Sequence, residues 1–119
     1  MATQDDIVVH ITSSETEDWQ MALRNLQKLA GNESVSASPD SMHVVINGGA
    51  VRFLLSATPE GDRIPQMAAA GVDIEACANS LGRLGFSPDE LAEGVTVTDS
   101  GVAEVVRLQQ QDCTYLKLP

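Results

Sequence analysis

The residue with the clearest chemical potential is Cys77, in the stretch DIEACANSL at positions 73–81. A short apolar strand pattern covers 72–76, and helical spacing follows over 77–84. A thiol at the start of a helix faces unpaired backbone N–H groups and the positive end of the helix dipole, which both favour the thiolate. The alternative is a small buried apolar residue, since cysteine is among the most buried residue types. Position alone leaves both interpretations open.

The elements that must position Cys77 alternate between strands and helices. Strand patterns cover 7–11, 42–46, 72–76, 94–98 and 113–118, and helical patterns lie between them. A capping box of Ser14 and Glu17 is expected to start the first helix. This alternation predicts one α/β domain over 1–119, a flavodoxin-like three-layer sandwich with a mainly parallel five-stranded sheet in the order 2-1-3-4-5.

Ligands of such sheets bind at the carboxyl ends of the strands, where the strand order reverses. In the expected order this point lies between the first and third strands, so polar residues that follow the strands become pocket candidates. Besides Cys77, these candidates are Ser13, Ser14, Asn47, Gly48, Gly49, Arg52, Asn79 and Ser80. Arg52 is equally well explained as part of a solvated helix face. The Asn47-Gly48-Gly49 turn fits no nucleotide-binding spacing, and a strand-to-helix turn with a positive backbone angle explains it better.

Charge and composition exclude several classes of function. The formal net charge of −10 repels phosphate backbones, so nucleic-acid binding is not expected. Salt adaptation and ordinary solubility both explain such acidity. The sequence has no apolar run long enough to span a bilayer, and its first residues lack the basic and apolar regions of a signal peptide. We therefore expect a cytoplasmic protein without a membrane partner.

The remaining cysteine and the histidines give no further site. Cys113 precedes the last strand, at the opposite end of the sheet from Cys77, which predicts that the two thiols are too far apart for a disulfide. His10 and His43 lie within strands and have no metal-ligand spacing with the cysteines, so neither a metal nor a cofactor is expected. A phosphorylated receiver is excluded because Asp5 and Asp6 begin the first strand rather than follow it.

The order and spacing of several segments resemble the DsrE/DsrF-like family, which includes sulfur-relay proteins. The resemblance spans nearly the whole chain, and its segments are VVHI at 8–11, ALRNL at 22–26, VVINGGAVRFLL at 44–55, GVDIEACANSL at 71–81, GVTV at 94–97, VAEVVRLQQ at 102–110 and YLK at 115–117. It implies the flavodoxin-like sheet and a homo-oligomer, a trimer or a hexamer of two trimers. In sulfur-transferring members a cysteine after the third strand carries sulfur as a persulfide, and Cys77 matches that position. Ala78-Asn79-Ser80 stands where relatives often have Gly-Asn-Thr.

The resemblance thus implies an intracellular sulfur relay with protein donors and acceptors of sulfur. The Cys77 thiolate would take a sulfane sulfur from a donor and yield it to an acceptor thiol. N–H groups of 13–14 and 47–49, with Asn79 and Ser80, would surround the anion. Two alternatives stay open. The protein is a non-catalytic oligomeric binding protein whose Cys77 lines a pocket, or it binds a small molecule or nucleotide at the point where the strand order reverses.

Overall fold

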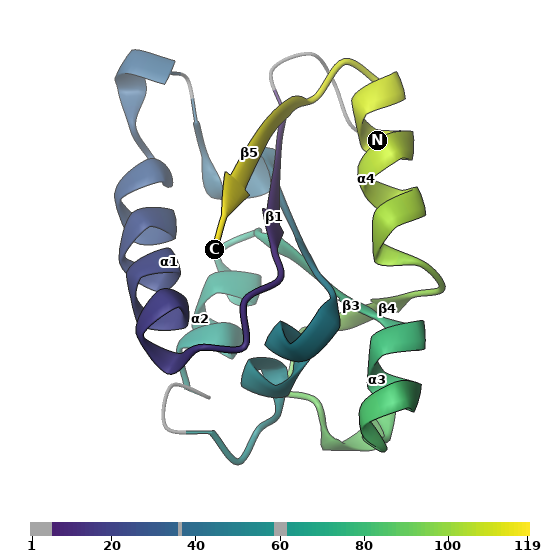
Figure 1. The fold of residues 1–119 in the computed structure, drawn as a ribbon. Coiled ribbons are helices and arrows are strands. Elements are labelled where there is room, and N and C mark those ends of the chain that lie inside the picture. The colour runs from purple at the N-terminus through teal and green to yellow at the C-terminus, as the bar shows by residue number, and fades with distance from the viewer. Residues whose placement is uncertain (1–5, 36, 59–61) are drawn as a thin grey trace.

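The computed structural model describes residues 6–35, 37–58 and 62–119 (Figure 1). Expectations about residues 1–5, including Asp5, lie outside this part of the chain. The strands are β1 Ile7–Ile11, β2 Met42–Ile46, β3 Asp73–Cys77, β4 Thr96–Thr98 and β5 Thr114–Leu118. The α-helices are α1 Thr16–Leu29, α2 Arg63–Ala69, α3 Ala78–Leu84 and α4 Gly101–Gln110. Short 3₁₀ helices are η1 Glu33–Val35, η2 Pro39–Ser41, η3 Gly48–Leu54 and η4 Pro88–Glu90.

The strands form one parallel sheet in the order β4-β3-β2-β1-β5. The predicted class, an α/β flavodoxin-like sandwich with five strands, is confirmed, but the strand order differs from the predicted 2-1-3-4-5. From β1, each of the next three strands is added on the same side of the sheet, so β2, β3 and β4 follow one another outward. Only β5 lies on the other side of β1. The neighbours of β3 are consequently β2 and β4, and β1 lies one strand farther from Cys77.

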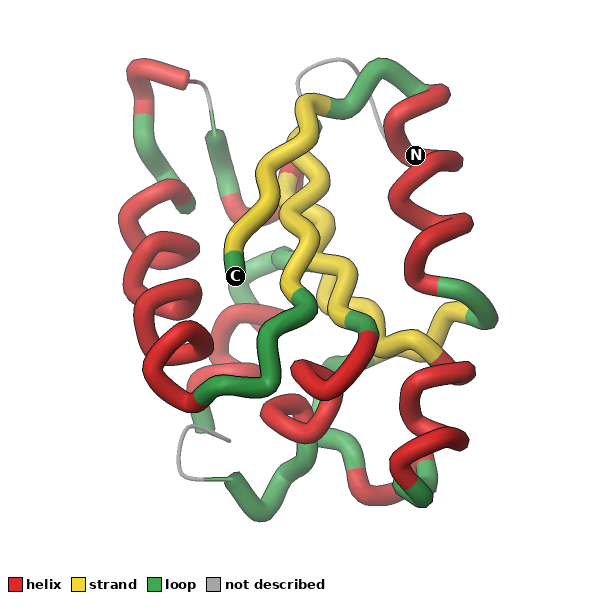
Figure 2. The backbone as a smooth tube through the Cα atoms, in the orientation of Figure 1, coloured by secondary structure: helices red, strands yellow, loops and turns green. Residues whose placement is uncertain are grey.

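Helices cover the two faces of the sheet unequally. Helices α1 and α2 lie on one side and α4 lies on the other, with the strands between them as a single layer (Figures 1 and 2). The face toward α1 carries the main core, which includes Trp19, Leu23, Ile46 and Ile74. The face under α4 has a small apolar cluster of Val8, Val45, Val105, Leu108 and Cys113. Helix α3 packs against η3 at the carboxyl edge of the sheet.

Local signals placed most elements within a few residues. The expected capping box of Ser14 and Glu17 is wrong, because α1 has Glu15 as its N-cap residue and no side chain caps it. The Ser13 hydroxyl accepts the N–H of Glu15 instead, at 3.2 Å, so the turn is one residue longer than the sequence suggested. Within the described ranges, no helix is long and apolar enough to cross a membrane.

Candidate functional site around Cys77

Cys77 ends β3 and is the N-cap residue of α3, so its side chain lies where the strand gives way to the helix. The residue is only 5% exposed. Gly101, the first residue of α4, lies against it: a Cβ added to Gly101 would be 3.3 Å from the Cβ of Cys77 and 3.0 Å from that of Asn47. Glycine at position 101 therefore lets the N-terminus of α4 approach Cys77, and the first turns of α3 and α4 converge on one thiol.

The surroundings of Cys77 favour the thiolate. Burial alone would raise the pKa of this thiol, but the Ser80 hydroxyl and the backbone N–H groups of Gly101, Ser80 and Asn79 together lower it. The thiol does not form a strict capping hydrogen bond within α3. The donors act on the sulfur as oriented dipoles, and they stabilise it most when it is charged. The predicted helix-start environment of Cys77 is thus present, with donors from α4 added to those of α3.

Ser80 connects the thiol to the turn after β2. The backbone N–H of Gly48 donates to the Ser80 Oγ at 2.7 Å, which leaves the hydroxyl proton free to point at Cys77. A small pocket of about 160 Å³ opens beside this pair and is lined by Gly48, Gly49, Ser80, Arg83 and Leu84. Arg83 was missed in the sequence, although it lies three residues after Ser80 and so shares its helix face. The pocket therefore has one cationic side chain next to the Cys77 turn.

The remaining predicted pocket residues contact one another or the first turn of α1. Ser13 Oγ donates to Asp18 at 2.6 Å, and the Arg52 guanidinium donates to the backbone oxygen of Ser14 at 2.9 Å. Gly49 packs on Ser14, since a Cβ at position 49 would be 2.6 Å from that of Ser14. These contacts hold the loop after β1 against η3. Because β2 lies between β1 and β3, we infer that this loop supports Gly49 in the lining of the small pocket rather than contacting the Cys77 sulfur.

Asn47 joins the site to a histidine on the same sheet face. The Asn47 Oδ1 accepts the Nε2–H of His10, whose Nδ1 lies 3.1 Å from the Tyr115 hydroxyl. Asn47 also lies against Gly101, next to Cys77. His10 is thereby held by Asn47, which follows β2, and by Tyr115 on β5, and β2 separates its own strand from β3. Its position at the carboxyl end of β1 agrees with the sequence, but its bond to Asn47 was not anticipated.

A group of acids lies under α4, on the same face of β3 as Cys77. Burial, together with the neighbouring carboxyl groups of Glu104 and Asp73, raises the pKa of Glu75 to about 9. Glu75 is therefore protonated at neutral pH and puts no negative charge two residues before Cys77. The hydrogen bond to His43 lowers the pKa of Asp73, against the effect of burial. The pKa of Glu104 is lowered as well: burial opposes this, but Glu75 and Arg107 outweigh it.

Cys113 has the opposite character to Cys77. It is 7% exposed, belongs to the small cluster under α4, and lies just before β5 at the amino end of the sheet. Burial, followed by the charges of Asp6 and Asp112, raises the pKa of its thiol. Neither cysteine is in a disulfide. The structure thus gives Cys113 the environment of a packed, poorly reactive thiol.

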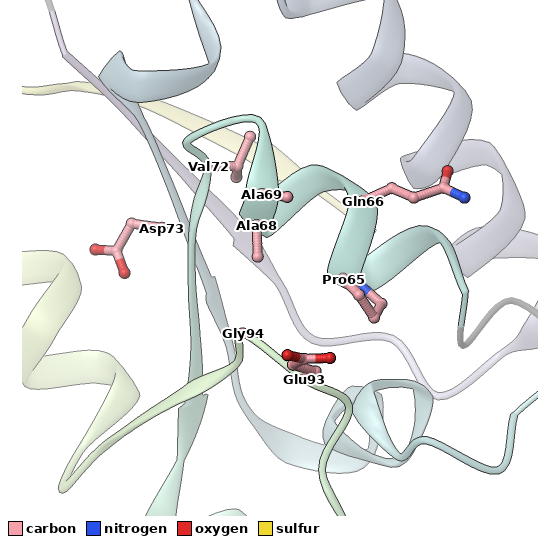
Figure 3. Close-up of a pocket in the computed structure, with 8 residues that line it drawn as sticks. All are labelled: Pro65, Gln66, Ala68, Ala69, Val72, Asp73, Glu93 and Gly94. Carbon is pink, nitrogen blue, oxygen red and sulfur yellow. The ribbon is translucent and has the colours of Figure 1, made fainter.

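A second pocket, of about 520 Å³, lies between α2 and the turn before β4 (Figure 3). It is lined by Pro65, Gln66, Ala68, Ala69, Val72, Asp73, Glu93 and Gly94. The Asp73 carboxylate points away from the other labelled residues, so the pocket itself presents few charged groups. The residues predicted to form a site all lie outside this lining.

Comparison with known proteins settles the family. The model of the DsrE/DsrF-like family matches residues 6–118, which is nearly all of the chain. The chain belongs to the DsrE/DsrF-like family. No curated protein matches this member of the family.

Solved structures share this DsrE/DsrF-like fold. A protein of unknown function from Methanobacterium thermoautotrophicum is 26% identical, with a TM-score of 0.84 over 94% of this chain and 97% of that one. The YchN protein from E. coli is 21% identical, with a TM-score of 0.71 over 95% and 99% of the two chains. A conserved protein of unknown function from Bacteroides thetaiotaomicron is 15% identical, with a TM-score of 0.72 over 99% of each chain. The last two likenesses show the fold alone.

Proposed function

We propose that this protein carries sulfane sulfur as a persulfide on Cys77 within an intracellular sulfur relay. The observation that supports this most strongly is the set of donors around Cys77: the Ser80 hydroxyl and the N–H groups of Gly101, Ser80 and Asn79 lower its pKa despite burial. A sulfur carrier needs a thiolate nucleophile at neutral pH, because the thiolate is the form that attacks sulfur. Membership of the DsrE/DsrF-like family supports the same chemistry.

The proposed cycle has two balanced steps. In the first, the Cys77 thiolate attacks the terminal sulfur of a donor persulfide, R–S–SH. A new S–S bond forms at Cys77, the donor S–S bond breaks, and the donor leaves as the thiolate RS⁻. In the second, an acceptor thiolate attacks the outer sulfur of the Cys77 persulfide and releases the Cys77 thiolate. Neither step needs an oxidant, and each moves one sulfur atom between thiols.

The small pocket beside Ser80 supports this cycle by its size and charge. Its volume is about 160 Å³, and its lining includes Arg83 and Ser80, the residue whose hydroxyl acts on the Cys77 thiol. A persulfide adds one sulfur atom to Cys77, and a cationic side chain at the pocket favours the anionic form of that sulfur. Protonated Glu75 adds no opposing charge. These features favour a small anionic sulfur species over a bulky substrate.

The protein is also proposed to act as a homo-oligomer, a trimer or a hexamer, in the cytoplasm. Apolar side chains on the outer face of α4 and on the edge strand β5 support self-association, since Val102, Val106 and Tyr115 are exposed by 59%, 49% and 40%. Measurement of the molar mass by light scattering tests this. A monomer at micromolar concentration contradicts it.

One observation favours a second function. Cys77 is 5% exposed, as expected for a thiol that only fills space or lines a pocket in a non-catalytic binding protein. The two functions differ in what the residue must do. The carrier requires the sulfur atom itself, whereas the binding protein tolerates Cys77→Ala with its assembly and binding intact.

Intact-mass spectrometry after exposure to polysulfide tests the carrier directly. Wild type and Cys113→Ser are expected to gain the mass of one sulfur atom, and Cys77→Ser is expected to gain none. Cys113→Ser is the matched control, because it removes a thiol that is equally buried but has a raised pKa. Equal loading of wild type and Cys77→Ser, or loading of both cysteines only after unfolding, would reject the proposal.

A further inference from the structure

His43, Asp73 and Glu75 form a compact group of polar side chains beneath α4. His43 on β2 is in register with Asp73 on β3, and Val45 of the apolar cluster under α4 is in register with Glu75. Because alternate residues of a strand face the same side, all three side chains project toward α4. One nitrogen or oxygen of each residue lies within 4.8 Å of the others. The parallel register thus assembles an imidazole and two carboxyl groups from residues that are far apart in the sequence.

His43 is held by a carboxylate at each of its ring nitrogens. Its Nε2 lies 2.9 Å from Asp6 Oδ2, and its Nδ1 lies 3.1 Å from Asp73 Oδ2. Metal-binding histidines commonly donate their second N–H to a carboxylate, which fixes the tautomer and the ring orientation. Without an ion, Nδ1 donates to Asp73, and with Asp6 accepting the Nε2–H, loss of the Nδ1 proton would leave a lone pair for a metal on the Asp73 side of the ring. The His43 side chain is 14% exposed, so this orientation is enforced by its surroundings.

Glu75 supplies an independent sign of a missing ligand. The residue is 7% exposed, and its Oε2 is buried without a hydrogen-bond partner among the described residues. A buried carboxyl oxygen without a donor is costly, so such atoms in native proteins call for an explanation. The carboxylates of Asp73 and Glu104 accept hydrogen bonds from protonated Glu75, and they offer no donor to its Oε2. A cation in this space satisfies Glu75 Oε2 and neutralises the group.

We propose that His43 Nδ1, Asp73 and Glu75 bind one divalent transition-metal ion, with Asp6 as the orienting partner of His43. Two ligands bound to one ion at about 2.1 Å are roughly 3.0–3.4 Å apart in octahedral and tetrahedral sites, and the Nδ1–Oδ2 distance of 3.1 Å falls in this range. The atoms of the whole set lie within 4.8 Å of one another, so one side chain would move inward by at most roughly 1.4–1.8 Å to bind the same ion.

The ligand set also selects the ion. An imidazole combined with carboxylates suits Zn²⁺ or Mn²⁺, whereas Mg²⁺ and Ca²⁺ prefer oxygen ligands throughout. The Asp73 side chain is 42% exposed and gives the ion a route from solvent. Its carboxylate points away from the pocket on the opposite side (Figure 3). A bound ion would tie β2 to β3 at the amino end of the sheet, and its binding does not depend on the sulfur chemistry of Cys77.

Zinc binding is the test, carried out with untagged protein that has been stripped with a chelator. The background is the double variant Cys77→Ser, Cys113→Ser, so that thiolates cannot hold the ion and failure of the sulfur proposal cannot affect the result. After equilibration with Zn²⁺ and desalting, elemental analysis is expected to find one zinc per chain. Mn²⁺ is the second probe, and Mg²⁺ is expected to bind at least tenfold more weakly than either.

Three variants locate the ion, and a fourth controls for loss of a surface histidine. His43→Ala, Glu75→Gln and Asp73→Asn are each expected to weaken zinc binding at least tenfold, and His10→Ala is expected to leave it unchanged. Asp73→Asn is the variant least able to disturb folding, since its side chain is 42% exposed. Circular dichroism checks the fold of each. Absence of zinc from the background protein would overturn the proposal. So would folded Asp73→Asn and Glu75→Gln variants that bind zinc as tightly as the background protein.

Discussion

The Ser80 hydroxyl is expected to set much of the reactivity of Cys77. Ser80→Ala removes this donor while the N–H groups of Gly101, Ser80 and Asn79 remain. A hydrogen bond to a charged group contributes about 1.5 kcal/mol, which corresponds to about a tenfold change in the ratio of thiolate to thiol. The pKa of Cys77, now below its ordinary value, is expected to move back up. At pH values below the pKa of wild-type Cys77, the variant should contain about tenfold less Cys77 thiolate than wild type.

Alkylation by iodoacetamide, followed by intact mass across a range of pH, measures this effect. Below the pKa the rate for Ser80→Ala is expected to be about tenfold lower than for wild type, because only the thiolate reacts. At high pH both proteins are fully ionised, and the rates should converge. Convergence separates an altered pKa from altered access, since a blocked thiol reacts slowly at every pH.

Two controls complete the experiment. Ser80→Thr keeps a hydroxyl and is expected to restore most of the rate. Ser87→Ala removes a capping hydroxyl from η4, the helix after α3, and is expected to leave the rate unchanged. Ser80→Ala also leaves the Gly48 N–H without its acceptor, which costs about 1–3 kcal/mol of stability, so unfolding is monitored in parallel. The reasoning is refuted if the midpoint of the dependence of the alkylation rate on pH is the same in Ser80→Ala as in wild type. It is also refuted if the alkylation of Ser80→Ala is slowed equally at all pH values.

Three further predictions concern packing, protonation and the second thiol. Gly101→Ala places a Cβ 3.0 Å from that of Asn47, so it should destabilise the fold by about 1–3 kcal/mol in urea denaturation and slow Cys77 alkylation; an unchanged protein would show that α4 does not approach so closely. In metal-free protein, Glu75 keeps its proton up to about pH 9 when folded but loses it near its ordinary pKa of 4.5 when unfolded, so stability should fall as pH rises between these values. Glu75→Gln should flatten this decline in thermal melts, and the same dependence of melting temperature on pH in both proteins would contradict the prediction. Native alkylation should label Cys77 before Cys113, whose pKa is raised, and the reverse order on peptide mapping would count against both assignments.

The sequence was sufficient for the class of fold but not for the strand order. Helix and strand periodicity located all five strands to within about two residues, and the alternation of strands with helices predicted a parallel sheet with right-handed crossovers. Handedness does not say on which side of β1 the second strand lies. Burial could have decided this, because β2 (MHVVI) is buried almost throughout, whereas β4 (TVT) and β5 (TYLKL) are largely exposed. Two polar strands are the natural edges, and that choice gives the observed order.

The error in strand order explains only part of what the sequence analysis missed. Asn79 and Ser80 are adjacent to Cys77 in the chain, so local spacing was enough to place them. Gly101 was missed for a different reason: β4 adjoins β3 in both the predicted and the observed order, but a glycine at a helix start does not reveal which side chain it packs against. The group of His43, Asp73 and Glu75 was also invisible, since its members come together only through the register of β2 with β3. Contacts between strands depend on topology, which single-sequence patterns leave open.

Discharge of a loaded protein tests the central claim most directly. Wild type is loaded with polysulfide, freed of the donor by desalting, and mixed with a small acceptor thiol such as glutathione, and the mass is followed with time. The account predicts that the added sulfur atom leaves Cys77, that the protein returns to its original mass, and that the glutathione persulfide appears in equal amount. A sulfur atom that never adds, or one that adds to Cys77 and cannot be removed by any thiol, would contradict it.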